Sequence, residues 1–225
     1  AKAQPAAARC VDSAIDLASG EPVVVRMYGR KKAGHASPLV VHFHGGAFVS
    51  GDLDNGHTVA HLLEGAGAVV VSVAYPLTPF PQPVDTGYGV LQWVHRHRTK
   101  LGGQGALVYL AGEEAGGNLA AAVALMARDQ AHPPLAGQIL LSPMLDPCVG
   151  SASQRRTTGD AVERKLSKSL SNFLGNPLDA DHPYVAPYPP CRLAGLLPNL
   201  SLVRVARPLR SSSLAYHAPR HAAPM

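Results

Sequence analysis

Two short segments of the chain carry residue types that could act on a carbonyl group. Residues 112–117 read GEEAGG, with Glu114 midway between two glycines. Residues 44–46 read HGG and directly follow the apolar run Leu39–Phe43. Flanking glycines allow a sharp turn that exposes the side chain at its apex, and glycine amides can donate to a developing oxyanion because no Cβ blocks the approach. The two segments therefore predict a turn that presents Glu114 and a loop that offers Gly45 and Gly46 as N–H donors.

Strand-sized and helix-sized segments alternate along the chain, which predicts an α/β fold with a mostly parallel sheet flanked by helices. The GEEAGG segment lies between a predicted strand and an Ala-rich predicted helix, and a nucleophile turn requires that context. Trp93 is expected to point inward, and the proline-rich residues 79–83 are expected to be irregular. The predicted strands are Val23–Tyr28, Leu39–Phe43, Ala68–Ala74, Ala106–Ala111, Leu135–Ser142 and Leu200–Val205. The predicted helices are His57–Glu64, Val84–Arg98, Asn118–Asp129, Ala161–Leu174 and Leu209–Tyr216.

The length of 225 residues suits one α/β domain and is short for two. We expect a single domain over residues 1–225, C-terminally shortened, with a reduced cap or loop region at 148–190 and an atypical end at 199–225. The longest apolar runs are strand-sized, which predicts no membrane span. The N-terminus has no apolar signal segment, and the three cysteines have unrelated spacings, so neither a disulfide framework nor a metal site is predicted. A cytoplasmic protein without a cofactor is expected.

The formal charge of +5 is concentrated near the C-terminus. From His182 onward the chain contains no Asp, Glu or Lys, but it contains Arg192, Arg204, Arg207, Arg210 and Arg220. These arginines alternate with Pro, Ser and Leu rather than with aromatic residues that could stack on bases. Nucleic acid is therefore not an expected partner.

The motifs and their order resemble the esterases and lipases of the hormone-sensitive-lipase type, a group of α/β-hydrolases. Val41–Asp52 resembles their oxyanion loop, and Ala111–Asp129 resembles their nucleophile elbow and the helix after it, with Glu114 where the family has serine. The resemblance implies that Gly45, Gly46 and Ala115 supply the oxyanion hole. Further stretches that are similar to the family are Leu140–Pro147, Tyr184–Pro187 and Leu193–Pro198.

The sequence departs from that family at the positions that perform catalysis. Arg207 stands where the family has its catalytic aspartate, and the family's histidine lies beyond a later strand that this sequence does not reach. The family's Arg- and Glu-containing loop is altered at Tyr75–Pro79. With Glu114 at the nucleophile position, the triad is incomplete. The resemblance then implies an esterase-like pseudoenzyme with little or no activity on carboxylic esters.

Two other functions stay open. The vacated pocket could bind a small apolar molecule or an acyl ester, as the plant gibberellin receptors of the same family bind their ligand. Alternatively, Glu114 could act as a carboxylate nucleophile, with Asp146 as a substitute acid or with a histidine supplied by a partner. His44, His95 and His97 are not placed to complete such a site. We also expect the Glu114 carboxylate itself to lie near the N–H groups of Gly45 and Gly46 or the N–H of Ala115, directly or through one water, because those donors need an acceptor.

Overall fold

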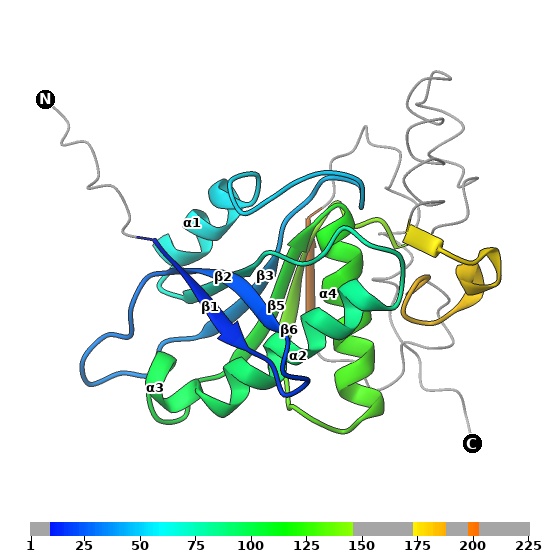
Figure 1. Ribbon diagram of the computed structural model, residues 1–225. Coiled ribbons are helices and arrows are strands. Elements are labelled where there is room, and N and C mark those ends of the chain that lie inside the picture. Colours follow the sequence, from blue (N-terminus) through cyan, green and yellow to red (C-terminus); the bar gives the residue numbers. More distant parts are fainter. Residues whose placement is uncertain (1–9, 146–172, 188–197, 203–225) are drawn as a thin grey trace, which may run out of the picture.

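The computed structural model describes residues 10–145, 173–187 and 198–202 (Figure 1). The strands are β1 (Val11–Asp16), β2 (Pro22–Tyr28), β3 (Leu39–Phe43), β4 (Val69–Val73), β5 (Val108–Glu113), β6 (Gly137–Leu141) and β7 (Asn199–Leu202). The helices are α1 (His57–Gly65), α2 (Gln82–Arg96), α3 (Arg98–Gly102), α4 (Ala115–Asp129) and the 3-10 helix η1 (Pro177–Asp181). The strands form one sheet in the order β1-β2-β4-β3-β5-β6-β7.

The sheet is parallel from β4 to β7, and among the described strands only β2 runs the other way, antiparallel to both β1 and β4. In β3 and β4 every residue is buried, as expected for strands covered on both faces. Pairing aligns Phe43 with Gly112 across β3 and β5. Because the strands are parallel, the segments that follow β3 and β5 leave the sheet at the same edge. The two sequence motifs are therefore brought side by side.

Helices cover the two faces of the sheet unequally (Figure 1). The larger apolar cluster joins α2 and α4 to one face through side chains such as Leu91 and Leu119. The smaller cluster joins α1 to the other face through Ala60, which packs with Tyr28 and Val70. Helix α4 lies against the central strands β3, β5 and β6. Its position fixes where the turn between β5 and α4 presents its side chains.

The structure confirms the α/β-hydrolase fold class and most of the predicted elements. The prediction for residues 79–83 was partly wrong, because α2 begins at Gln82 and holds Pro83 in its first turn. Proline is tolerated there, since the first N–H groups of a helix have no intrahelical acceptor. Strand β1 was not predicted; it is an edge strand, and Val11 is half exposed.

Several other predictions shift or fall outside the described residues. The helix predicted over 84–98 is two helices, α2 and α3, separated at His97. The predicted helix 161–174, except for its last two residues, and the predicted helix 209–216 lie outside the described residues, as does most of the 148–190 region. None of the helices in the described ranges is long and apolar enough to cross a membrane.

Candidate functional site

The turn between β5 and α4, called the elbow here, is centred on Glu114 as predicted. Glu114 has φ 52° and ψ −113°, a conformation that non-glycine residues rarely adopt and that costs roughly 1–3 kcal/mol. The surrounding backbone holds it there: the N–H of Glu114 donates to Leu141 O at 3.1 Å, and Met144 N–H donates to Glu114 O at 2.9 Å. A strained residue fixed between a strand and a helix is the geometry in which hydrolases expose a reactive side chain.

Glycine is required at Gly116 because the helix packs directly on the end of β3. A Cβ on Gly116 would lie 2.1 Å from the carbonyl oxygen of Phe43. The loop after β3 is equally tight, since Gly46 has φ 128° and a Cβ there would lie 1.9 Å from Ser50 O. Ala47 and Phe48 continue the loop with positive φ. Elbow and loop are therefore held in contact by backbone close approach.

The Glu114 side chain lies beside Gly45. Its Oε2 atom is 3.4 Å from the point where a Cβ on Gly45 would stand. Both Glu114 and Glu113 are partly buried, and their charges add to burial in raising the pKa of the neighbouring Tyr75. The loop and the elbow therefore enclose two carboxylates.

Glu113 takes part in a contact that the sequence reasoning missed. Its Oε2 lies 2.8 Å from Nε2 of His42, and Nδ1 of His42 lies 3.0 Å from the hydroxyl of Ser72. The same carboxylate accepts the N–H of Gly45 through Oε1 at 3.3 Å. The only sequence signal was a His two residues before the HGG segment, on the buried strand β3.

The Gly45 contact bears on the predicted oxyanion hole. The N–H of Gly45 already has an acceptor, whereas no acceptor among the described residues is found for the N–H of Gly46. Ala115, the third predicted donor, is the first residue of α4 and is fully buried. The first N–H groups of a helix lack intrahelical acceptors. Gly46 and Ala115 are therefore better placed than Gly45 to receive an anion.

His44 is a buried structural residue of this site. Its ring stacks on Tyr75 at 4.3 Å, its Nδ1 lies 2.8 Å from Gly45 O, and the Tyr75 hydroxyl donates to His44 O at 2.7 Å. Burial lowers the pKa of His44, so the ring stays neutral near pH 7. A neutral ring engaged at Nδ1 fixes the loop and does not serve as a free general base.

The other predicted site residues are not brought to the elbow. His95 and His97 lie at the far end of α2, where His95 contacts His132 and His97 stacks on the partly buried Trp93. Arg207 and Asp146 lie outside the described residues. Within the described residues, no group of three His, Cys, Asp or Glu side chains could hold a metal ion.

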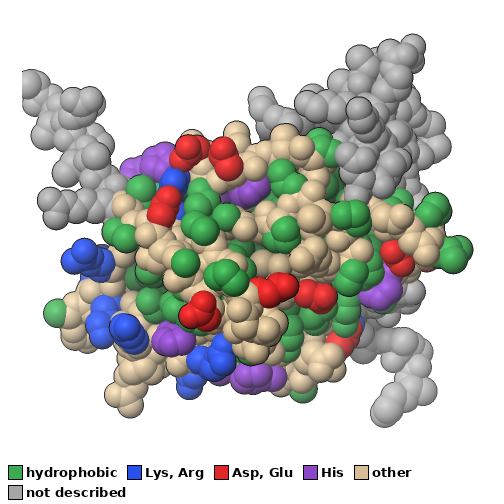
Figure 2. Space-filling model, viewed as in Figure 1, with side chains coloured by type: hydrophobic (Ala, Val, Ile, Leu, Met, Phe, Trp, Pro, Cys, Tyr) green, Lys and Arg blue, Asp and Glu red, His purple; other side chains and the backbone are tan. Residues whose placement is uncertain are grey.

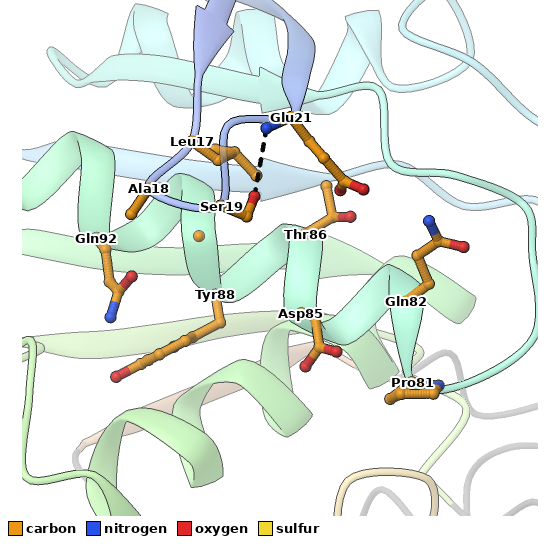
Figure 3. Close-up of a pocket in the computed structure, with 11 residues that line it drawn as sticks. Leu17, Ala18, Ser19, Glu21, Pro81, Gln82, Asp85, Thr86, Tyr88 and Gln92 are labelled. Carbon is orange, nitrogen blue, oxygen red and sulfur yellow. Dashed lines mark hydrogen bonds between the residues drawn. The ribbon is translucent and has the colours of Figure 1, made fainter.

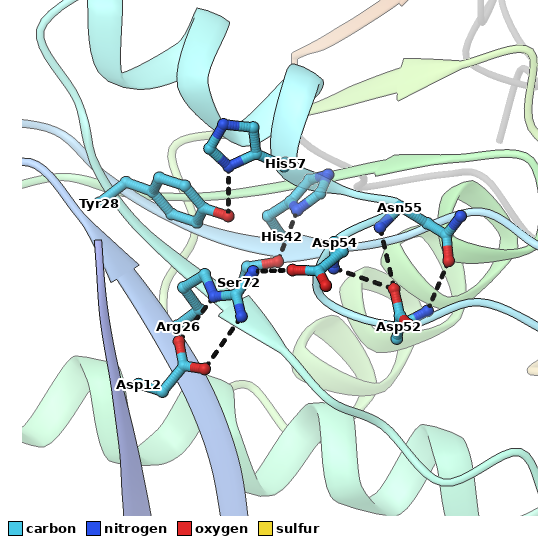
Figure 4. A network of polar contacts seen from close by, with 9 residues as sticks. All are labelled: Asp12, Arg26, Tyr28, His42, Asp52, Asp54, Asn55, His57 and Ser72. Atoms are coloured by element: carbon cyan, nitrogen blue, oxygen red, sulfur yellow. Dashed lines mark hydrogen bonds and ion pairs between the residues drawn. The ribbon is translucent and has the colours of Figure 1, made fainter. Parts of the chain in front are cut away.

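A polar network on the other side of the loop holds residues 52–55 in place (Figure 4). Arg26 on β2 pairs with Asp12 at 2.6 Å and with Asp54 at 2.5 Å. The Asp12 pKa is lowered by its hydrogen bond to Arg26. Asp52 accepts the N–H groups of Asp54 and Asn55, each at 3.0 Å. The loop after β3 is therefore anchored beyond Gly51 as well as at Gly45.

A separate groove of about 390 Å³ lies between the β1–β2 turn and α2 (Figure 3). Its lining includes Leu17, Tyr88 and the carboxylates Glu21 and Asp85, and burial raises the pKa of Asp85. None of its lining residues belongs to the elbow or to the loop after β3. The groove is therefore not part of the candidate site.

Fold and sequence together identify the class of protein. Residues 40–223 match a family model described as alpha/beta hydrolase fold. This range covers most of the chain and contains the loop, the elbow and the parallel strands that carry them. The chain belongs to the α/β-hydrolase family, and its relatives support an esterase-like member.

Individual relatives make the resemblance more specific. Esterase LipI of Mycobacterium tuberculosis is 34% identical over 220 residues, which are 92% of this chain and 68% of LipI. A gibberellin receptor of Arabidopsis thaliana, GID1C, is 34% identical over 77% of this chain and 54% of the receptor. The structure of an esterase from Pyrobaculum calidifontis superposes with a TM-score of 0.82 at 33% identity, covering 93% of this chain and 71% of that one.

Proposed function

We propose that this chain is a carboxylesterase-like α/β-hydrolase homologue in which Glu114 occupies the nucleophile position, and that it hydrolyses esters little or not at all. The observation that carries the proposal is the strained backbone of Glu114 at the apex of the elbow. In the esterases that the sequence resembles, serine stands at that position. The scaffold for catalysis is thus retained while the reacting group differs.

The electrostatics around Glu114 argue against ester hydrolysis. An oxyanion hole works because N–H dipoles create a positive potential where negative charge develops. Here the Glu113 and Glu114 carboxylates both lie beside Gly45, and like charges close together repel a developing oxyanion. Attack by Glu114 would also leave an anhydride, whose hydrolysis needs a base to activate water.

The histidines near the elbow do not supply that base. Both ring nitrogens of His42 are engaged, by Glu113 and Ser72, and His44 is buried against Tyr75. At the position of the family's catalytic acid the sequence has Arg207. The proposal therefore includes the loss of the acid as well as the nucleophile.

The test is recovery of activity in the Glu114→Ser variant, measured with p-nitrophenyl acetate against the Glu114→Ala variant. We expect the two variants to be alike, because a serine without a base and an acid remains a weak nucleophile. Loss of a complete triad costs about a million-fold in kcat. A large gain in the Glu114→Ser variant alone would show that a histidine completes the site, and would overturn the proposed loss of function.

A second candidate function is binding of a small apolar ligand, and the named gibberellin receptors among the relatives favour it. The N–H of Gly46, for which no acceptor is found among the described residues, would suit a ligand with one hydrogen-bond acceptor. We place such a protein in the cytoplasm. A thermal-shift screen with acyl esters and carboxylic acids tests it: a saturable rise in Tm that Gly46→Ala abolishes supports binding, and no shift in the folded wild type opposes it.

A further inference from the structure

The cations of the described fold gather at the edge of the sheet opposite the elbow. They lie in two segments, the loop before β3 and the end of α2 with α3, and we call them the cationic edge: Arg30, Lys31, Lys32, Arg96, Arg98 and Lys100. All six are exposed. Lys and Arg side chains collect at one end of the molecule, around α3 and the neighbouring loop (Figure 2).

These charges are not neutralised within the protein. Among the described residues none of the six forms an ion pair with a carboxylate. Arg26 and Arg128, the remaining described arginines, are both paired with aspartates. Neither residues 29–38 nor residues 95–107 contain Asp or Glu. An uncompensated patch of this kind produces a positive field that attracts anions.

Backbone contacts hold the two segments together. Ser37 N–H donates to Gly102 O at 2.8 Å, and Leu39 N–H donates to Leu107 O at 2.9 Å. Between the segments lies an open hollow of about 520 Å³, whose lining includes Lys31, Lys32 and His35 but no carboxylate. The two segments therefore lie side by side, which places their cations at the same edge of the sheet.

An exposed aliphatic side chain accompanies these cations. Leu107, which precedes β5, is 57% exposed and is held beside the start of β3 by the bond to Leu39. More than half of this leucine side chain is therefore open to solvent. Cations together with an exposed apolar side chain are typical of surfaces that rest on lipid headgroups.

We propose that the cationic edge docks the protein reversibly on a lipid surface with anionic headgroups. Exposed lysines suit such a surface, because the negative potential of the headgroups attracts each ammonium group without requiring a fixed contact geometry. A free phosphate ligand would not use Leu107. Nucleic acid fits less well because Trp93, the aromatic residue of this region, is partly buried and stacked on His97.

The topology fixes the orientation of the docked protein. The cationic edge lies where β3 and β5 begin, and the elbow lies where the same strands end. The candidate site would therefore face the aqueous side, away from the lipid. This inference does not depend on the proposed function, because it concerns the other edge of the sheet.

The experiment is co-sedimentation of the full chain with vesicles of phosphatidylcholine alone or with added phosphatidylglycerol. We expect binding only to the anionic vesicles, decreasing as NaCl is raised, because screening weakens such contacts. Lys31→Gln/Lys32→Gln should weaken binding by roughly tenfold or more, because each cation near an anionic surface contributes favourable binding free energy. Leu107→Ser should also weaken it while leaving binding to a soluble polyanion such as heparin unchanged.

The matched control is Arg207→Gln/Arg210→Gln, which removes two charges from the Arg-rich C-terminal sequence. The proposal requires that this variant bind the vesicles like the wild type. Far-UV circular dichroism verifies that each variant is folded. If the control loses binding while the cationic-edge variant keeps it, the docking surface is wrongly assigned. Equal binding to neutral vesicles, or tighter binding to double-stranded DNA than to vesicles, would overturn the lipid assignment.

Discussion

The two edges of the same parallel sheet have opposite characters. At the carboxyl edge, the elbow and the start of the loop after β3 are mostly buried and are locked by close backbone contacts, and the charged groups of elbow and loop are all carboxylates: Glu113, Glu114, Asp52 and Asp54. At the amino edge, the charged groups are exposed cations on the loop before β3, at the end of α2 and on α3. The difference teaches that one sheet can carry a rigid, acidic edge and an exposed, basic edge at the same time. It also shows that exposed cations from separate segments can together make a positive surface, although none of them belongs to a defined site.

The largest expected effect breaks the carboxyl edge itself. Gly116→Ala places a Cβ 2.1 Å from Phe43 O, where both partners are fixed backbone. We expect a loss of about 3 kcal/mol or more in the free energy of unfolding, which is the range of severe overpacking and strain. Urea denaturation measures it. Gly65→Ala is the matched control, because a Cβ there meets nothing within 4 Å and alanine favours the helix; an equal loss in both variants would contradict the account.

A smaller effect is expected from the buried pair behind the elbow. Glu113→Leu removes the acceptor for His42 and for the N–H of Gly45, leaving buried donors without a partner. The expected cost is about 1–3 kcal/mol in the free energy of unfolding. Glu113→Gln keeps an acceptor oxygen and should lose less. If the two variants unfold at the same urea concentration, the network does not support the loop.

The free energy of unfolding should depend on pH through His44, at the carboxyl edge. Burial holds the pKa of His44 below its ordinary value of 6.5, so the unfolded chain binds a proton at a higher pH than the folded one. The contribution of the neutral His44 ring to the free energy of unfolding is therefore present above pH 6.5 and is lost as the pH falls below that value. Thermal unfolding between pH 5 and 8 should show a slope that is reduced in His44→Gln and unchanged in His35→Gln.

The smallest expected effect on stability belongs to the amino edge. Lys31→Gln/Lys32→Gln should change the free energy of unfolding by less than about 0.5 kcal/mol, because both side chains are exposed and neither forms an ion pair with a described residue. Urea denaturation again provides the measurement. A change above about 1 kcal/mol would mean that the cations support the fold rather than forming a binding surface.

The sequence predicted the carboxyl edge well because its motifs are local. Strand, turn and helix follow one another around Glu114, and Leu39–Phe43 is the observed strand β3 to the residue. Contacts between distant segments were not readable in this way. The pairing of Glu113 with His42 depends on the register of β3 and β5, and the cationic edge depends on how residues 29–38 lie against α3. Summing charges along the chain pointed to the C-terminal arginines and hid this second concentration of charge.

The most direct test of the central claim is the steady-state rate of p-nitrophenyl acetate hydrolysis by the wild type and the Glu114→Ala variant at high protein concentration. If the elbow is preserved but chemically inert, the two proteins should hydrolyse the ester at the same rate, no faster than an unrelated protein of equal concentration. A wild-type rate that rises above this background, saturates with substrate and disappears in Glu114→Ala would contradict the account, because it would make Glu114 a working nucleophile.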